Sequence, residues 1–213
     1  MMEICTCKSF SISTFFTGAV YTDNTLRNTY FPAEGIMDGS VLAIKEHYSK
    51  PNNKMVDKVP TKYDRVIVLV RDPKHAFLAE FNREKADKSS HVGVVDDKTF
   101  KEYWPKYFTP GRLGWWKSMG LYFKNEYKPH QVIFVSYESL QANLTATLTD
   151  IMHFLGHSYP SDIARCVEKS EEGGFHRPKH ERQLAFLTKQ QNETLQKAKE
   201  EVYNKLGLEI LTP

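Results

Sequence analysis

The stretch that decides the fold is "DRVIVLVRDPKHAFLAEFNR", residues 64 to 83. Its apolar run, Val66 to Val70, has no polar break, which is typical of a strand covered on both faces of a parallel sheet. The run stops at Arg71, and Asp72 followed by Pro73 is typical of a helix N-cap and first helical position. The stretch therefore predicts a strand that ends in an arginine and leads directly into a helix from Lys74 to about Lys85.

Two other segments resemble this strand. "SVLAIK", Ser40 to Lys45, and "QVIFVS", Gln131 to Ser136, are similar apolar runs, and the central one spans Arg65 to Val70. Helical patterns lie between and after them, including "FKEYWPKYF" and "GWWKSMGLYFKNEY". Strands that alternate with helices predict an α/β domain with a parallel sheet.

The last third of the chain predicts two more helices. Leucine and isoleucine recur at helical intervals between Leu140 and Leu155, and Gly156 then ends that helix. A final helix is predicted from about Thr188 to Leu206, with Gly207 after it.

Composition limits the classes of function. The 213 residues are 40% hydrophobic and 26% charged with a net charge of +3, which suits one globular domain and is too weakly basic to indicate nucleic acid. Three cysteines make no disulfide framework, and no His or Cys cluster follows Cys5 and Cys7, so we expect no metal. No apolar run is long enough to span a membrane, and the first residues are too polar for a signal peptide. We therefore expect no membrane contact by this chain.

Chemically useful side chains follow each predicted strand. Lys45 and His47 follow the first, Arg71 the second and Tyr137 the third, and ligands of such sheets bind outside the carboxyl ends of the strands. Arg71 also precedes a helix N-terminus, where free N–H groups and the helix dipole favour anions. The pattern predicts an anion site, with phosphate as the anion. Taken singly, these residues have ordinary alternatives: an ion-paired surface arginine, a solvated histidine and a packed tyrosine.

Two common nucleotide-binding loops are absent from the sequence. Neither "GIMDGS" nor "EEGGFHRP" has the lysine and hydroxyl of a Walker loop, and no G-x-G-x-x-G occurs. We therefore expect neither ATP or GTP hydrolysis nor a dinucleotide site. A relative of the nucleotide kinases, which shares the α/β layout, would need that Walker loop.

The motifs together resemble the sulfotransferases that use 3′-phosphoadenosine-5′-phosphosulfate (PAPS). "IKEH" ending at His47 is similar to their Lys-Thr-His motif, "VRDP" to Arg-Asn/Asp-Pro, and "SYESL" to Tyr-Glu-Asp. "FLG" and "GGFHRPK" are similar to two later segments of those enzymes. "FFTGAVYTDNTL", "LAEFNR" and "GWWK" are similar to the WSC-domain-containing sulfotransferases, which are associated with O-sulfation of sialic acid.

The resemblance implies a three-layer α/β fold, P-loop NTPase-like, with a parallel sheet flanked by helices. It implies transfer of a sulfonyl group from PAPS to a hydroxyl of a glycan or glycoprotein, without a metal, with sialic acid as a candidate acceptor. His47 would be the general base and Lys45 would stabilise the transferring group. Arg71 and Arg177 would bind the 3′-phosphate, and Tyr137 would contact the nucleoside. It also implies a place at the lumenal side of the Golgi membrane.

Three departures from the family pattern leave an alternative open. No segment before Phe15 has the form Pro-x-x-Gly-x-Thr-Trp of the family's phosphosulfate loop. We therefore expect residues 1–13 to be a divergent segment, and 14–213 to be one sulfotransferase-like domain, N-terminally truncated and lacking its first strand and loop. Ala79 replaces a frequent serine, and Glu46 replaces a threonine. The alternative is a sulfotransferase-like pseudoenzyme that acts as a binding module.

The acceptor side carries weaker signals. The predicted acceptor loop, Asp87 to Phe100, has no signature of a particular sugar. Trp115 and Trp116 are suited to stacking on a sugar, but their place in a helical pattern favours the core.

Overall fold

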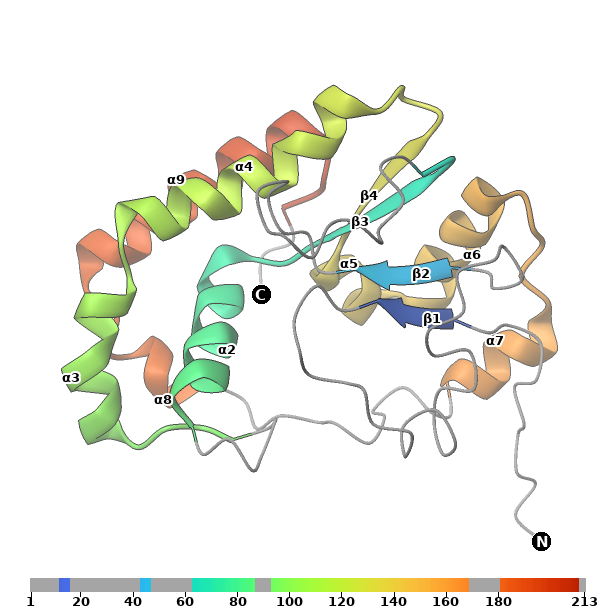
Figure 1. Ribbon diagram of the computed structural model, residues 1–213. Coiled ribbons are helices and arrows are strands. Elements are labelled where there is room, and N and C mark those ends of the chain that lie inside the picture. The colour runs from blue at the N-terminus through green and yellow to red at the C-terminus, as the bar shows by residue number, and fades with distance from the viewer. Residues whose placement is uncertain (1–11, 16–42, 47–62, 87–92, 169–180, 211–213) are drawn as a thin grey trace, which may run out of the picture. The chain divides into compact units, whose positions relative to one another are not determined.

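The computed structural model describes residues 12–15, 43–46, 63–86, 93–168 and 181–210 (Figure 1). The chain divides into two compact units, Met1–Tyr63 and Asp64–Pro213. The predicted single domain over 14–213 stays a prediction.

The described residues of the first unit include a pair of parallel strands. Strand β1, Ile12–Phe15, pairs with strand β2, Ala43–Glu46, with Thr14 opposite Lys45. The described part of β2 falls at the end of the predicted strand, whose first residues lie outside the described ranges. Strand β1 was not predicted, because four residues of mixed polarity carry no clear alternation.

The second unit contains the other parallel pair. Strand β3, Val66–Val70, pairs in register with strand β4, Val132–Ser136, so that Val70 lies opposite Ser136. Both strands agree with the predicted ones to within a residue, and their parallel pairing confirms the α/β prediction. The chain leaves β3 and reaches β4 through three helices, as a parallel connection requires.

Eight helices belong to the described part of this unit. They are α2 (Pro73–Lys85), α3 (Asp97–Tyr107), α4 (Pro110–Glu126), α5 (Tyr137–Ala142), α6 (Leu144–Leu155), α7 (Ser161–Glu168), α8 (Glu181–Leu184) and α9 (Lys189–Leu206). The helices predicted over Lys74–Lys85 and Thr188–Leu206 are confirmed. The helical patterns "FKEYWPKYF" and "GWWKSMGLYFKNEY" are also confirmed, as α3 and α4.

The single helix predicted between Leu140 and Leu155 is wrong. Two helices occupy this region, and they meet at Asn143, which ends α5 and caps α6. The Asn143 side chain accepts a hydrogen bond of 3.1 Å from the backbone N–H of Ala146. An asparagine side chain competes with the helix backbone for hydrogen bonds in this way. The apolar residues therefore keep their helical spacing across Asn143, although the helix itself is interrupted there.

Local caps set the ends of the other helices. The Asp72 side chain accepts a hydrogen bond from the N–H of Lys74 at the start of α2. Thr188 and Gln191 form a capping box at the start of α9. Gly156 ends α6 with φ of 83°, a left-handed conformation that glycine adopts without strain.

Helices α4 and α9 lie side by side and cover one face of the β3–β4 pair (Figure 1). Val68 and Val70 of β3 belong to the cluster that includes the fully buried Val202 and Tyr203 of α9. The two helices approach closely at Gly120, where an added Cβ would lie 3.1 Å from a methyl group of Val202. Leu69, which projects to the other face, is 56% exposed.

A second cluster is mainly aromatic and joins α2 to α3. Phe81 is fully buried, and its ring meets those of Phe100, Trp104 and Tyr107 edge to face at 5.1–5.4 Å. Such pairs add to the free energy gained by burying the rings. The cluster fixes α2, and with it the position of the residues at its N-terminus.

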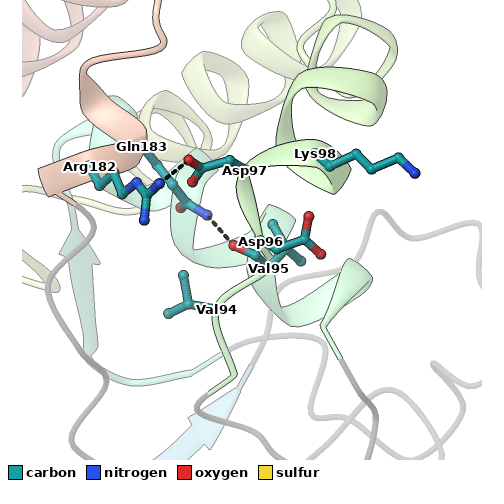
Figure 2. A pocket seen from close by; sticks show the side chains of 7 residues that line it. All are labelled: Val94, Val95, Asp96, Asp97, Lys98, Arg182 and Gln183. Atoms are coloured by element: carbon teal, nitrogen blue, oxygen red, sulfur yellow. Dashed lines mark hydrogen bonds and ion pairs between the residues drawn. The ribbon is translucent and has the colours of Figure 1, made fainter.

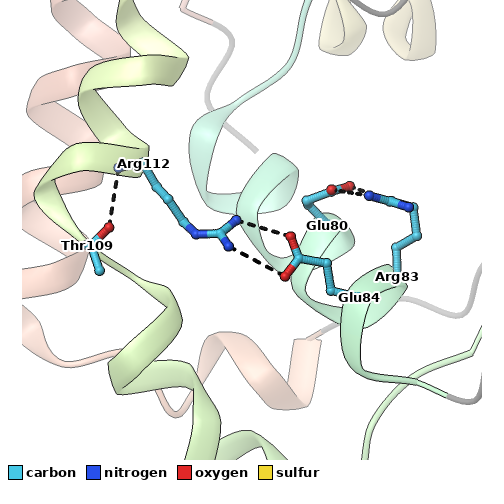
Figure 3. A network of polar contacts seen from close by, with 5 residues as sticks. All are labelled: Glu80, Arg83, Glu84, Thr109 and Arg112. Carbon is cyan, nitrogen blue, oxygen red and sulfur yellow. Dashed lines mark hydrogen bonds and ion pairs between the residues drawn. The ribbon is translucent and has the colours of Figure 1, made fainter. Parts of the chain in front are cut away.

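Polar contacts on the surface also hold α2. Figure 3 shows Arg112 of α4 reaching Glu84 of α2, with 3.1 Å between Nη1 and Oε1, while Arg83 pairs with Glu80 within α2. The Arg112 guanidinium also lies 4.0 Å above the ring of Tyr107. Burial raises the pKa of that tyrosine far above its usual value.

The two tryptophans of α4 have different environments. Trp116 is partly buried and packs against both hydrophobic clusters, as predicted. The core prediction is wrong for Trp115, which is 49% exposed. Adjacent positions on a helix point about 100° apart, so one face could not hold both rings.

Candidate functional site

Two of the predicted site residues meet where β3 and β4 end. Because the strands are parallel and in register, Arg71 and Tyr137 leave neighbouring carboxyl ends. The guanidinium carbon of Arg71 lies 4.6 Å from the centre of the Tyr137 ring, a cation–π contact. The tyrosine thus supports the flat face of the arginine and leaves the edge nitrogens to bind other groups.

The Nε atom of Arg71 has unused hydrogen-bonding capacity. It is buried and makes no hydrogen bond. A buried donor without an acceptor lowers stability, and more so when it is charged. The indole Nε1 of Trp104 is also unpaired, but it is uncharged and lies in the aromatic cluster. At Arg71, by contrast, the unpaired donor belongs to a cation at a strand end, which suits an anionic oxygen.

The backbone at the start of α2 is less available than the sequence predicted. The N–H of Asp72 donates to Glu138 Oε1 at 3.0 Å, and the N–H of Lys74 donates to Asp72 Oδ1 at 2.8 Å. Pro73 has no N–H. The prediction that free N–H groups attract the anion here is therefore wrong for these residues, because carboxylates of the same loops already accept from them.

Helix α9 contacts the loops that follow both strands. Lys199 Nζ lies 2.9 Å from Asp72 Oδ2, and Tyr203 donates to Glu138 Oε2 at 2.7 Å. Lys199 and Tyr203 are both buried. Burial, followed by the contact with Glu138, raises the pKa of Tyr203 far above its usual value, so this hydroxyl keeps its proton.

One histidine lies beside these groups. His75, in the first turn of α2, is half-buried, and its pKa is lowered, first by burial. Asp72 opposes that shift and Arg71 adds to it. The imidazole is therefore neutral at pH 7 and adds no charge to the cations near this end of α2, which include Arg71, Lys74 and Lys199.

Four residues of this region were not predicted as part of the site: His75, Glu138, Lys199 and Tyr203. A signal for Lys199 was present, since it occupies the apolar face of α9 between Leu195 and Val202. A lysine at such a position is almost never fully buried unless it is paired.

The other predicted site residues cannot be related to Arg71. His47 and Arg177 lie outside the described residues. The backbone of Lys45 belongs to β2, in the other unit, and its side chain is not described. Ala79 lies within α2, as expected from its spacing after Arg71.

A pocket of about 440 Å³ lies where the segment before α3 meets α8 (Figure 2). Arg182 and Asp97 form an ion pair at its edge, and Gln183 donates to the carbonyl of Val95. Part of the predicted acceptor loop lines this pocket, through residues 94 to 98. Charges of both signs there give no preference for one ligand.

The described residues contain neither a candidate metal cluster nor a candidate membrane-spanning helix. None of these residues form a group of three or more His, Cys, Asp and Glu side chains that could hold a metal ion. None of the helices in this part of the chain is long and apolar enough to cross a membrane.

Comparisons with known proteins agree with the motifs. The family model described as "Sulfotransferase domain" matches residues 40–205. A WSCD family member of Aedes aegypti is 31% identical over 195 residues, and one of Drosophila melanogaster is 31% identical over 197. Each match covers 90% of this chain but 58% of the relative, so the chain spans little more than half the length of these proteins.

Solved structures of two proteins are also similar. The crystal structure of mouse sulfotransferase SULT7A1 complexed with PAP has a TM-score of 0.48 at 16% identity, covering 76% of this chain and 65% of that one. That of retinol dehydratase, in complex with androsterone and inactive cofactor PAP, has a TM-score of 0.48 at 15% identity, covering 84% and 57%.

Proposed function

This chain belongs to the sulfotransferase domain family, and we propose that it transfers a sulfonyl group from PAPS to a carbohydrate hydroxyl. The observation that carries the proposal is Arg71, a half-buried cation with an unpaired Nε at the shared end of two parallel strands. The similarity to WSCD family members supports the same class of reaction. The resemblance inferred from short motifs is thus confirmed at the level of the family.

The described residues fit the 3′-phosphate end of the donor. The Nε of Arg71 is a charged donor that has no hydrogen-bond partner among the described residues, and the ring of Tyr137 holds its guanidinium in place. Arginine suits this role because its planar fork matches two phosphate oxygens at once. The aromatic ring of Tyr137 also offers a surface for the nucleoside.

PAPS supplies the sulfonyl group when it is bound. In this proposal His47 takes the proton from the acceptor hydroxyl, which makes that oxygen a better nucleophile. Lys45 stabilises negative charge on the transferring group, and Arg177 is a second cation for the 3′-phosphate. These roles are predicted from the family motifs.

The acceptor is proposed to be a glycan, with sialic acid as the first candidate. The exposed ring of Trp115 is suited to stacking on a sugar. By family resemblance, we place the reaction in the Golgi lumen.

A transfer assay tests the proposal. The 213-residue chain is incubated with PAPS that carries radioactive sulfur and with sialylated glycans, and labelled glycan is measured. We expect label in the glycan with the wild-type chain, and its loss in His47→Ala and Arg71→Met. Arg83→Met is the matched control, since this exposed arginine pairs only within α2. Binding of the nucleotide without transfer would instead assign a sulfotransferase-like binding module, and absence of both would contradict the family role of the site.

A further inference from the structure

Two carboxylates directly follow the two residues of the proposed phosphate site. Asp72 follows Arg71, and Glu138 follows Tyr137. Carboxylates near a bound phosphate repel it, and the repulsion is strong where water is excluded. A site built to bind an anion therefore needs some means of offsetting these two charges.

Helix α9 supplies a partner for each carboxylate. Lys199 lies 2.9 Å from Asp72, and Tyr203 donates a hydrogen bond of 2.7 Å to Glu138. The hydrogen bond from the N–H of Asp72 to Glu138 ties the two loops to each other. One helix face thus contacts both strand-end loops.

The burial of Lys199 indicates that its charge matters at this position. Its side chain is 6% exposed and that of Asp72 is 14% exposed, so both charges are largely removed from water. Desolvating an ion pair cancels much of the attraction gained, and apolar residues of similar volume are often as stable. The neighbouring positions on this face, Leu195 and Val202, are apolar, so packing alone does not require a lysine.

We propose that Lys199 is a positioning residue. It neutralises Asp72 next to the anion site, so that Arg71 remains available to the phosphate. The proposal rests on the proposed function, in which Arg71 binds the 3′-phosphate of PAPS. Without Lys199, the Asp72 carboxylate loses its cationic partner and becomes an alternative partner for Arg71, the preceding residue in the chain.

The two oxygens of Asp72 separate its roles. Oδ1 caps α2 through the N–H of Lys74, and Oδ2 pairs with Lys199. Asparagine is as good an N-cap as aspartate, so Asp72→Asn keeps the cap and removes the charge. Lys199→Met keeps the cap and the aliphatic bulk and removes the opposite charge. The pair therefore permits a double-mutant cycle in which the two single substitutions are predicted to have opposite effects on the affinity for the phosphate ligand.

The experiment measures the Kd for adenosine 3′,5′-bisphosphate by calorimetry at low and high salt, using the full chain. We expect Lys199→Met to raise the Kd about tenfold and Asp72→Asn to lower it severalfold, since one leaves an extra negative charge and the other an extra positive charge. The double variant, Asp72→Asn with Lys199→Met, should return to within about threefold of wild type. Lys205→Met is the matched control, because Lys205 is an exposed lysine of the same helix, and it should leave the Kd unchanged.

A purely structural role for Lys199 predicts a different pattern. Both single variants would then bind more weakly, and each loss would follow the fall in Tm measured in parallel. That pattern, or wild-type affinity in Lys199→Met, would overturn the proposal. If Lys199→Met does not fold, Asp72→Asn still tests the proposal. Tighter binding of the bisphosphate by this variant is expected only if the negative charge of Asp72 opposes binding.

Failure of the proposed function has its own signature. If wild type and Arg71→Met bind the bisphosphate equally, there is no phosphate site at Arg71 and both proposals fall. If Arg71→Met loses binding while Lys199→Met does not, the role of Lys199 alone is wrong.

Discussion

The two ends of α2 satisfy their buried polar groups very differently. Asn82, near the C-terminal end, is fully buried, and its amide nitrogen donates to the Leu78 carbonyl and to Gln183 Oε1. Its oxygen accepts from the N–H of Val95 and from Gln183 Nε2. Arg71, just before the N-terminal end, keeps a buried nitrogen without any hydrogen bond.

The difference separates a structural site from a binding site. Buried polar groups in native proteins are nearly always paired, and a network that is complete within the protein serves stability. An unpaired charged donor that is already fixed by a stacked ring lowers stability on its own and gains a partner when an anion binds. We therefore expect changes at the C-terminal end of α2 to affect folding, and changes at Arg71 to affect binding.

The largest expected effect is on the aromatic cluster. Phe81→Ala should lower the free energy of unfolding by about 4 kcal/mol, because it removes a fully buried ring from three aromatic neighbours and leaves a cavity. Urea denaturation followed by circular dichroism measures the change. Tyr103→Ala, at an exposed ring, should cost less than about 1 kcal/mol. Equal losses in the two variants would show that this cluster does not anchor α2.

Asn82→Ala should have the next largest effect. It leaves Gln183 and the N–H of Val95 without their buried partner, so we expect a loss of about 3 kcal/mol in the free energy of unfolding. The same denaturation experiment applies, with the exposed Asn204→Ala as the control. A change below about 1 kcal/mol would mean that water replaces the lost contacts and that the network is not required.

Arg71→Met should barely affect stability in the absence of nucleotide. The variant loses the cation–π contact with Tyr137 but also removes the unpaired buried nitrogen, so we expect a change within about 1 kcal/mol. Thermal unfolding without ligand measures it. A loss as large as that of Asn82→Ala would indicate a structural arginine and remove the contrast between the two ends.

The smallest effect concerns the exposed ion pairs of α9, which contrast with the buried pair of Lys199. Hydrogen bonds from Lys117 and Lys205 lower the pKa of Glu201 to about 2. Because the folded pKa is depressed, the contribution of Glu201 to stability is present above pH 4.5 and is lost as the pH falls towards 2. The Tm of wild type should therefore exceed that of Glu201→Gln near pH 6, and the gap should close in acid. A gap that does not change with pH would contradict this assignment.

Much of the second unit could be predicted because its signals are local. The sequence Asp72-Pro73 predicted the start of α2, and Gly156 and Gly207 predicted the ends of α6 and α9. The apolar runs predicted β3 and β4, and the strand-end rule predicted that Arg71 and Tyr137 meet. Each of these inferences needs only neighbouring residues or the known geometry of parallel strands.

The partners of the site could not be predicted because they come from distant parts of the chain. Tyr203 reaches Glu138 across 65 residues, and Lys199 approaches Asp72 from the last helix. Local patterns carry no information on which face of α9 meets which loop. For the same reason, the sequence could not show that the carboxylate of Glu138 already accepts a hydrogen bond from the N–H of Asp72.

The most direct test of the central claim is the Kd for adenosine 3′,5′-bisphosphate in wild type, Arg71→Met and Arg83→Met. Loss of a charge-assisted hydrogen bond predicts that Arg71→Met weakens binding by about tenfold to a hundredfold. Arg83→Met, at the exposed side of the same helix, should bind like wild type. Equal affinity in wild type and Arg71→Met, with the same Tm in all three proteins, would contradict the account.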